Sequence, residues 1–201
     1  MNSSTTALLL VGYQNDYFGQ TGLLRQVVEA SERVNSVVEN TIQLIQSLPD
    51  SMLIVATPIR FSATYEELVE PIGILRRIKE IGAFQENTNG AKLISELVPL
   101  KRRILEVRGK RGFNAFAHTT LDAVLKEHSI RELVIAGAIT SICIDSTGRS
   151  AHEKGYRVTI LSDCTSARTT FEQEFYCDHI FPTYANVVTH KQLLNALKVT
   201  V

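Results

Sequence analysis

The chain has 201 residues, of which 44% are hydrophobic, so it is long enough and apolar enough to bury the core of one globular domain. Its 21 basic residues balance its 21 acidic residues, which excludes an electrostatic case for nucleic acid or an anionic membrane as a partner. No run approaches the roughly 18 apolar residues of a membrane span, so we expect a single domain over residues 1–201 that crosses no membrane.

The first residues and the cysteines predict a cytoplasmic location. Residues 1–6, MNSSTT, lack the basic flank and the cleavage site of a signal peptide. The three cysteines have no metal-ligand spacing, and free thiols are typical of a reducing compartment.

Short apolar runs alternate with helical patterns along the whole chain. The expected strands are residues 7–11, 51–57, 103–107, 131–138, 156–161 and 185–189. Helical spacing predicts a helix over about 23–48, which Pro49 ends, and a broken helix or lid over 65–81, which Pro71 interrupts. Further helices are expected over 118–128, after the fourth strand, and on either side of the last strand. Strands that read as unbroken apolar runs are typical of a parallel sheet covered on both faces, so the fold class is α/β.

The stretch 131–155, RELVIAGAITSICIDSTGRSAHEKG, holds the candidate nucleophile. An apolar run ends at Gly137, and helical spacing with small residues begins within a few residues of it. Cys143 falls in the first turn of that helix, where unpaired backbone N–H groups and the helix dipole favour a thiolate. The alternative is a small buried core residue, since Cys143 lies between Ile142 and Ile144.

Several motifs together resemble one known family, the isochorismatase-like cysteine hydrolases, over nearly the whole chain. The motifs are Gly137-Ala138-Ile139-Thr140 followed by Cys143-Ile144, a helix that ends in Gly155-Tyr156-Arg157-Val158 before Asp163, the run K-x-x-F-x-A-F from Lys110 to Phe116, and a last strand within residues 180–188. The resemblance implies a three-layer α/β/α domain with a six-stranded, mostly parallel sheet. It also implies a homo-oligomer that uses no cofactor.

The resemblance assigns roles to residues in loops that meet at the carboxyl ends of the strands. Cys143 is the nucleophile, and Lys110 lies beside it as a cation that favours the thiolate. The alternative for Lys110 is a solvated basic loop, with Arg108 as the substitute if the register differs. The amides of Ile139 and Cys143 receive the oxyanion, after a cis peptide bond that follows Ala138.

The same loops predict a small substrate pocket lined by aromatic side chains. The expected substrate-binding residues are Ala138, Ile139, Thr140, Tyr17 and Phe116, and the wider aromatic set adds Tyr13, Phe18 and Phe113.

The first loop departs from the family pattern. Residues 12–17, GYQNDY, align with D-x-Q-x-D-F, in which the first Asp is the general base, and here Gly12 takes that position. Asp16 is a candidate catalytic residue if the base has moved, and the alternative is a loop cap or hydrogen-bond organiser. A carboxylate restored by Gly12→Asp is expected to point toward Cys143 and Lys110 and to raise turnover.

No metal is expected at the site. Nicotinamidase members of the family hold a divalent ion with Asp and His residues after the second strand, and residues 57–62, TPIRFS, contain neither residue type. Cys164 and Cys177 are expected to be packing residues. The histidines are expected at the surface rather than as ligands; they are His118, His128, His152, His179 and His190.

Two functions remain open at this point. The leading one is a hydrolase that cleaves a C–N bond of a small amide through a covalent thioester at Cys143. Isochorismate ether hydrolysis is disfavoured because the members that perform it depend on the missing Asp. The alternative is a catalytically impaired member that binds a small molecule or a partner chain, which Gly12 favours, whereas intact Cys143 and Lys110 favour the enzyme.

Overall fold

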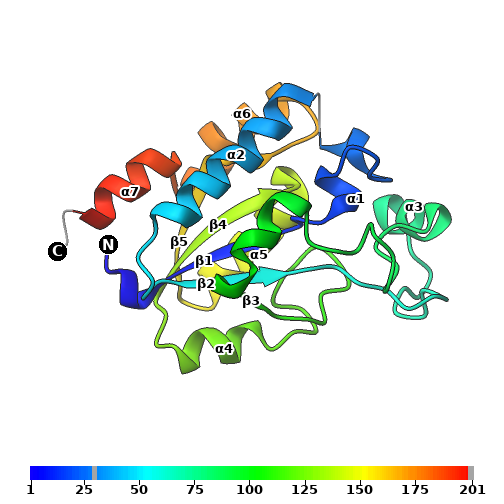
Figure 1. The fold of residues 1–201 in the computed structure, drawn as a ribbon, viewed down its shortest axis with the longest axis horizontal. Helices are drawn as coiled ribbons and strands as arrows, with labels where there is room; N and C mark the ends of the chain where they lie inside the picture. Colours follow the sequence, from blue (N-terminus) through cyan, green and yellow to red (C-terminus); the bar gives the residue numbers. More distant parts are fainter. Residues whose placement is uncertain (29–30, 199–201) are drawn as a thin grey trace.

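The protein is described by a computed structural model over residues 1–28 and 31–198. Six parallel strands form one sheet in the order β3-β2-β1-β4-β5-β6 (Figure 1). The strands are β1 (Thr6–Val11), β2 (Leu53–Thr57), β3 (Ile104–Glu106), β4 (Glu132–Ala138), β5 (Arg157–Ser166) and β6 (Asn186–Val188).

Helices cover both faces of the sheet, which makes the three-layer α/β/α architecture that the sequence predicts (Figure 1). One face packs against α2 and α7, and the other packs against α4 and α5. The helices are α1 (Asn15–Phe18), α2 (Ser31–Ser47), α3 (Gly73–Ile81), α4 (Leu121–Glu127), α5 (Asp145–Glu153), α6 (Thr170–Phe175) and α7 (His190–Lys198).

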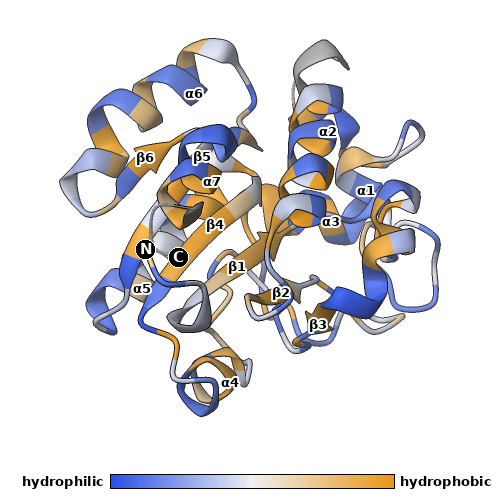
Figure 2. Ribbon diagram, turned by 60° about the vertical axis from the view of Figure 1, so that its left-hand side comes forward, coloured by the Kyte–Doolittle hydropathy of each residue, from blue (hydrophilic) through white to orange (hydrophobic). Residues whose placement is uncertain are grey.

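The central strands are buried along their whole length. Every residue of β1 and of β4 is buried, which explains why their sequences do not alternate between apolar and polar positions. The hydropathy colouring agrees, with apolar strands at the centre and a mixture of polar and apolar residues along the surrounding helices (Figure 2). The sheet therefore carries the core, and its carboxyl edge is free to hold loops.

The strand order places the candidate site. From β1 the chain continues outward through β2 and β3 on one side, and it returns at β4 to build β5 and β6 on the other side. This reversal between β1 and β4 is the topological switch point of the sheet. In open parallel sheets, ligands bind at the switch point, beyond the carboxyl ends of the strands. The loops that begin at Gly12 and at Ile139 follow these two strands.

Most element boundaries lie within a few residues of the prediction, and three differ further. The helix expected from about residue 23 begins at Ser31, residues 25–27 form a short 3-10 turn, and residues 29–30 lie outside the described residues. The segment 65–81 is helical only as α3, after Pro71, as a break at proline requires. Strand β5 runs on to Ser166, because its end pairs with Gly137 and Ala138 after a register shift.

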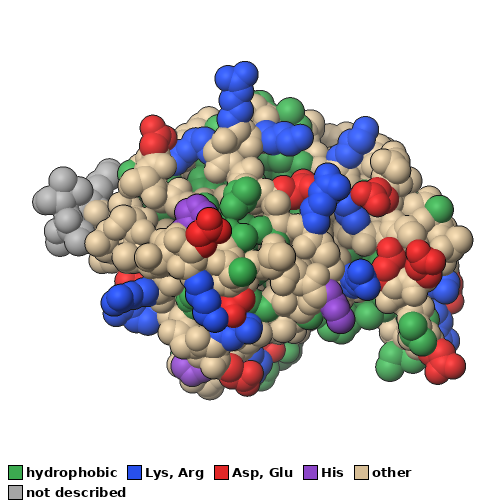
Figure 3. Space-filling view, turned by 90° about the horizontal axis from the view of Figure 1, so that it is seen from below, with side chains coloured by type: hydrophobic (Ala, Val, Ile, Leu, Met, Phe, Trp, Pro, Cys, Tyr) green, Lys and Arg blue, Asp and Glu red, His purple; other side chains and the backbone are tan. Residues whose placement is uncertain are grey.

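The surface shows no large area of one charge on the face seen in Figure 3, where basic and acidic side chains are interspersed. This distribution agrees with the equal counts of basic and acidic residues. Among the described residues, no helix has the length and apolar character needed to cross a membrane.

Candidate active site

The candidate nucleophile lies at the junction between β4 and α5. Residues Thr140–Ile144 form a π-helical turn, and α5 continues directly from it at Asp145. The amides of Ile142 and Ile144 both donate to the carbonyl oxygen of Ile139, which closes the turn tightly. Cys143 is only 2% exposed, so its sulfur is enclosed by neighbouring groups rather than by solvent.

Lys110 is the nearest charged group to that sulfur. Its Nζ lies 3.7 Å from Cys143 Sγ and donates a 2.6 Å hydrogen bond to the carbonyl oxygen of Gly112. The side chain is 1% exposed, and a lysine is rarely buried so completely without a partner. Burial lowers the pKa of the Lys110 ammonium, and the neighbouring Cys143 opposes that shift without cancelling it.

Backbone contacts fix the Lys110 loop against the sheet. Lys110 forms a parallel bridge with Ile59, which follows β2. Further along the loop, the amide of Ala115 donates a 3.0 Å bond to Thr147 Oγ1 on α5. The lysine loop is therefore anchored to the helix that follows the nucleophile, and the alternative of a solvated basic loop is wrong for Lys110.

Gly12 ends β1 with a backbone that does not suit a side chain. Its φ is +75°, in the left-handed region that favours glycine. A Cβ atom there would lie 2.8 Å from the carbonyl oxygen of Ala138 and 3.2 Å from Cδ2 of Tyr17. A side chain at position 12 therefore cannot be added without moving neighbouring atoms, which counts against the gain in turnover expected from Gly12→Asp.

Asp16 organises the loop. Its Oδ2 accepts a 2.6 Å bond from the amide of Phe84, and its Oδ1 accepts a 3.3 Å bond from the amide of Leu23. Both carboxylate oxygens are thus engaged with backbone donors. This geometry agrees with the hydrogen-bond organiser, which was the alternative to a relocated base.

The aromatic side chains expected to line one pocket pack against different partners. Tyr17 lies beside Gly12 and packs on Phe84, with ring centroids 4.8 Å apart. Phe116 instead stacks on Tyr156 with ring centroids 6.1 Å apart, and Lys154 Nζ lies over the Phe116 ring, 5.5 Å from its centroid. Of the remaining rings, Tyr13 and Phe18 stack on each other in the core, and Phe113 is 38% exposed.

The first residues of the strand-to-helix junction are fully buried. Ala138, Ile139 and Thr140 have no exposed surface, and the peptide bond between Ala138 and Ile139 is cis, as the resemblance implies. Thr140 Oγ1 donates a 2.6 Å bond to Oε1 of Gln173, which follows β5 on α6. A hydrogen bond to α6 therefore also stabilises the turn.

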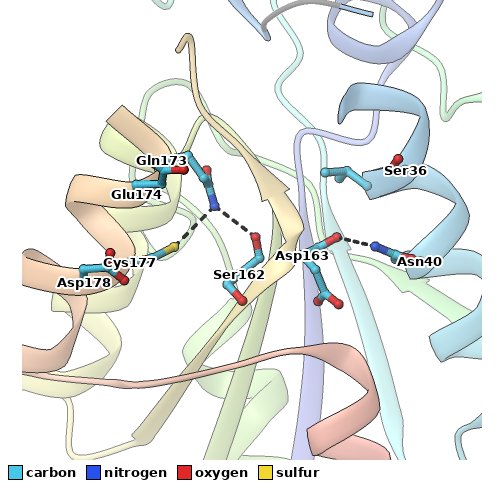
Figure 4. A pocket seen from close by; sticks show the side chains of 9 residues that line it. Ser36, Asn40, Ser162, Asp163, Gln173, Glu174, Cys177 and Asp178 are labelled. Carbon is cyan, nitrogen blue, oxygen red and sulfur yellow. Dashed lines mark hydrogen bonds between the residues drawn. The ribbon is translucent and has the colours of Figure 1, made fainter. Parts of the chain in front are cut away.

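Gln173 also lines a separate cavity of about 340 Å³ between α2, β5 and α6. Figure 4 shows its amide nitrogen directed at the carbonyl oxygen of Ser162 and at Cys177 Sγ, at 3.1 and 3.4 Å. On the opposite wall, Asn40 donates to the carbonyl oxygen of Asp163. Neither Cys143 nor Lys110 lines this cavity, so it is distinct from the candidate site.

Thr57 is a polar residue that the sequence analysis did not select. It ends β2, pairs with Val11 in the sheet and is fully buried. Within the part of the chain that the structure describes, its hydroxyl is the one buried side-chain polar atom without a hydrogen-bond partner. Val55, two residues earlier, belongs to the same core cluster as Cys143, so the strand alternation puts Thr57 on the nucleophile's side of the sheet.

One set of side chains in the described residues has the proximity of metal ligands, and it lies away from Cys143. It comprises Asp163, Cys164 and His190, whose potential ligand atoms lie within 4.8 Å of one another. His190 donates its amide to Asp163 Oδ1 at 2.8 Å, and its Nδ1 lies 2.7 Å from Oδ2. The expectation of a surface histidine is wrong here, because His190 is buried where α7 starts against β5.

The other two cysteines are buried, as expected of packing residues. Burial raises the pKa of the Cys164 thiol, and the adjacent charge of Asp163 raises it further. Cys177 accepts a hydrogen bond from Gln173. Neither has a lysine beside it in the described hydrogen bonds, in contrast to Cys143.

Comparisons with known proteins show the family of this chain. The isochorismatase domain model matches residues 6–192. The chain is 28% identical over 200 residues to the uncharacterized isochorismatase family protein YddQ of Bacillus subtilis (strain 168), covering 98% of this chain and 95% of that protein. It is 28% identical over 173 residues to the ureidoacrylate amidohydrolase RutB of Cronobacter sakazakii, covering 80% of this chain and 74% of that protein.

Solved structures share the fold. A cysteine hydrolase from Pseudomonas syringae pv. phaseolicola 1448A superposes with a TM-score of 0.87 at 17% identity, over 100% of this chain and 96% of that one. An N-carbamoylsarcosine amidase from Thermoplasma acidophilum has a TM-score of 0.72 at 20% identity, over 94% of this chain and 97% of that one. With the domain match across nearly its whole length, the chain belongs to the isochorismatase family of hydrolases.

Proposed function

We propose that the protein hydrolyses a C–N bond of a small carboxamide or carbamoyl compound, with Cys143 as the nucleophile. The observation that carries this proposal is the 3.7 Å contact between Lys110 Nζ and Cys143 Sγ, both enclosed at the carboxyl edge of the sheet. The names of the relatives support the bond type, because ureidoacrylate amidohydrolase, N-carbamoylsarcosine amidase and nicotinamidase all denote cleavage of a carbonyl–nitrogen bond.

In the first step, the Cys143 sulfur attacks the substrate carbonyl carbon and its proton passes to Lys110. The S–C bond forms as the C–N bond breaks, and Lys110 returns the proton to the departing nitrogen. The amides of Ile139 and Cys143 are the proposed donors to the carbonyl oxygen, where negative charge develops. The product of this step is a thioester and a free amine or ammonia.

In the second step, water attacks the thioester carbon. Lys110 accepts one proton from that water and delivers it to the sulfur as the S–C bond breaks. The carboxylic or carbamic acid then leaves, and the site is restored. The partnerless hydroxyl of Thr57 is a further polar group on this side of the sheet for a bound substrate or water.

Lys110 is the proposed proton acceptor because position 12 is a glycine and carries no carboxylate. Burial lowers its pKa, which favours the neutral amine that a base requires. General-base assistance is typically worth about 10²- to 10⁴-fold in rate, and cysteine depends on it least among the common nucleophiles. A Cys–Lys pair thus supplies both a nucleophile and a base for the reaction, although the family pattern carries an Asp as a third member.

The experiment is a turnover assay that measures amine or ammonia release from nicotinamide, ureidoacrylate, N-carbamoylsarcosine and related small amides. Wild type is compared with Cys143→Ala and with Lys110→Met, which keeps the length of the side chain and removes the amine. The matched controls are Cys177→Ala and Lys101→Met, because Lys101 is exposed on the surface.

We expect at least one amide to be turned over by wild type and by both controls. Cys143→Ala should abolish turnover, and Lys110→Met should lower kcat by about 10²-fold or more. A wild type that stays silent on a broad panel, while Cys143→Ala still binds small amides, would instead support a binding protein on the same fold. Activity that survives Cys143→Ala would refute the nucleophile assignment.

A further inference from the structure

Among the described residues, the large apolar side chains with the greatest exposure lie in two places. Val69 and Ile72, close together in the chain before α3, are 85% and 75% exposed. On α6, Phe171 is 75% exposed and stacks on the half-exposed Phe175, with ring centroids 5.9 Å apart. Single exposed apolar residues are normal on a monomer, whereas neighbouring ones mark interaction sites.

The first group forms a tip, residues 69–72, on the segment between β2 and α3. The base of the tip is fixed in the core, because Leu68 is buried and its amide donates a 3.0 Å bond to the carbonyl oxygen of Tyr65. Within the tip, Glu70 has a φ of +45°, a left-handed conformation that is uncommon for a residue with a side chain. The tip is thus a defined turn that presents two apolar side chains to solvent.

The second group borders a hollow of about 650 Å³ beside the nucleophile's turn. Phe171 and Phe175 supply its aromatic wall. Ser141 and Ile142, which directly precede Cys143, line it as well. Its volume is in the range of pockets that hold drug-sized ligands, so it has room for two aliphatic side chains.

Tip and hollow flank the candidate site at the same edge of the sheet. The tip follows β2, and its segment is held against the loop after β1, because the amide of Phe84 donates to Asp16. The hollow is built from residues that follow β4 and β5, on the other side of the switch point. The helix that continues from the tip, α3, lies apart from α6 in both Figure 1 and Figure 2, so one chain does not place its tip in its own hollow.

We propose that two copies of this chain form a dimer in which the tip of each copy is seated in the hollow of the other. When two copies meet at their carboxyl edges about a twofold axis normal to the sheet, their strand orders run in opposite directions along the shared edge. Each tip then lies opposite the partner copy's hollow, and the contact is made twice in a closed dimer. This inference names a surface for the homo-oligomer that the family resemblance implies, and it does not depend on the chemistry proposed for Cys143.

The chemistry of the two surfaces is complementary. At each contact, two aliphatic side chains meet an aromatic wall, which is the composition of an interface centre. Residues 61–75, which contain the tip, include three glutamates and no lysine or arginine. The hollow carries the opposite charge at Arg168, whose side chain is 56% exposed.

The bonds that Arg168 makes within its own chain leave it able to pair across the dimer. Glu172, the other charged residue of the hollow, accepts bonds from Arg168 and Ser141. The described bonds to Glu172 engage Nε and Nη2 of Arg168. A guanidinium has five N–H groups, so Arg168 can also bond Glu70 of the other copy.

The first test is the mass of the full chain in solution at micromolar concentrations, measured by light scattering. We expect wild type to have twice the 22.4 kDa mass of one chain. Val69→Asp and Phe171→Asp each place a carboxylate in the apolar contact and should weaken dimerisation about 30-fold or more, giving monomers. The matched control is Val98→Asp, because Val98 is also exposed, at 53%, and precedes β3 at the opposite edge of the sheet.

The second test is disulfide formation between two different single-cysteine variants. Val69→Cys protein mixed with Phe171→Cys protein should form a covalent dimer faster than either protein alone, because only the mixture brings the two new thiols together. Mass spectrometry of the linked peptides identifies the bond. Val98→Cys mixed with Phe171→Cys is the control and should not link faster than Phe171→Cys alone.

Three results would overturn the inference. The first is a wild type that stays monomeric at these concentrations. The second is a dimer that Phe171→Asp breaks and Val69→Asp leaves intact, because the hollow would then bind a surface other than the tip. The third is a Phe171→Cys protein that links to itself faster than it links to Val69→Cys protein. Each readout is mass or cross-linking, so the dimer can fail while the turnover proposed for Cys143 stands, and the reverse.

Discussion

A Cβ atom on Gly12 would lie 2.8 Å from the carbonyl oxygen of Ala138, closer than side-chain carbons approach backbone oxygens in folded proteins. The same closeness recurs one residue earlier on the facing strand, where a Cβ on Gly137 would lie 1.8 Å from the carbonyl oxygen of Val11. Strands β1 and β4 therefore meet at their carboxyl ends with no room for a side chain at either glycine. The glycine at position 12 and the close approach of the two strands are therefore one feature of this chain.

Substitution of Gly12 is expected to destabilise the protein and not to raise its activity. The positive φ alone costs about 1–2 kcal/mol for a residue with a side chain, and the contacts with Ala138 and Tyr17 add to that cost. We expect Gly12→Ala and Gly12→Asp to lower the free energy of unfolding by about 2 kcal/mol or more, measured by denaturant titration.

Two other glycines supply controls for that measurement. Gly155 has a φ of +88° and nothing within 4 Å of its Cβ position, so Gly155→Ala measures the backbone cost alone. Gly112 also has open space and no positive φ, so Gly112→Ala should be close to neutral. Gly12→Asp with wild-type stability and increased turnover would show that β1 and β4 can separate to admit a base.

Asp16 is expected to matter for stability rather than for proton transfer. Asp16→Asn keeps one side-chain oxygen as an acceptor and replaces the other oxygen with an NH₂ group, which is a donor. The NH₂ group then faces the amide of Phe84 or of Leu23, so that one backbone N–H loses its acceptor. The free energy of unfolding should fall by about 1–3 kcal/mol. At a temperature where the variant remains folded, the rate of Cys143 alkylation should have the same pH profile as in wild type. Loss of the acid limb of that profile would mean that Asp16 is the base.

The three thiols are expected to react in an order that exposure does not explain. Cys143 is 2% exposed and Cys177 is 8% exposed, yet Cys143 should be alkylated fastest because only it contacts the Lys110 ammonium. Cys164 should be slowest, since burial and then Asp163 raise the pKa of its thiol. Iodoacetamide labelling of the folded protein with peptide mapping gives the order, and faster labelling of Cys177 or Cys164 would contradict the site assignment.

Sequence patterns were sufficient for the sheet, for the nucleophile's turn and for the lysine loop. Unbroken apolar runs predicted buried parallel strands, and Gly137 near the end of β4 marked the turn to Cys143. The pairing of Lys110 with Cys143 came from the family motif, since 33 residues separate them and periodicity says nothing about such contacts. The strand order that brings them together depends on the crossover of the chain at β4.

The rest of the site depends on long-range packing that a sequence does not display. Phe116 belongs to a run that resembles the family motif, but its ring turns toward Tyr156 on the far side of the loop. Thr57 looked like one more strand residue, and only its burial without a partner identifies it. The strain at Gly12 is invisible without φ and the position of the Ala138 carbonyl oxygen.

The hydrogen bonds to Glu172 should make stability depend on pH. Burial opposes its ionisation, but bonds from Arg168 and Ser141 outweigh burial and lower the pKa of the Glu172 carboxyl. A lowered pKa in the folded state means that this stabilisation is present above the unfolded value of about 4.3 and is lost as pH falls through the folded value. Because solvent screens the pair with Arg168, the effect should be at most about 1 kcal/mol.

Unfolding of Glu172→Gln between pH 2.5 and pH 7 measures this contribution. The gap in stability between wild type and Glu172→Gln should close toward acid pH. Glu153→Gln, at an exposed position on α5, is the matched control and should run parallel to wild type at every pH. A constant gap for Glu172→Gln would mean that the carboxylate contributes nothing through ionisation.

The protein is expected to contain less than one equivalent of zinc, iron or manganese when it is purified without chelator and without a metal-affinity tag. Residues 57–62 lack the His and Asp ligands, and the carboxylate of Asp163 is already bonded to the His190 amide and faces its ring. Elemental analysis gives the content. A stoichiometric metal that His190→Ala removes would instead assign the Asp163–Cys164–His190 cluster as a metal site.

Turnover through a thioester on Cys143 is tested most directly by the mass of the protein during turnover. Wild type is mixed with an amide that it hydrolyses, quenched in acid within milliseconds to seconds, and measured by intact-protein and peptide mass spectrometry. We expect a mass increase equal to the acyl group, on the peptide that contains Cys143, and its absence in Cys143→Ala. An acyl adduct on any other residue, or full turnover by Cys143→Ala, would contradict it.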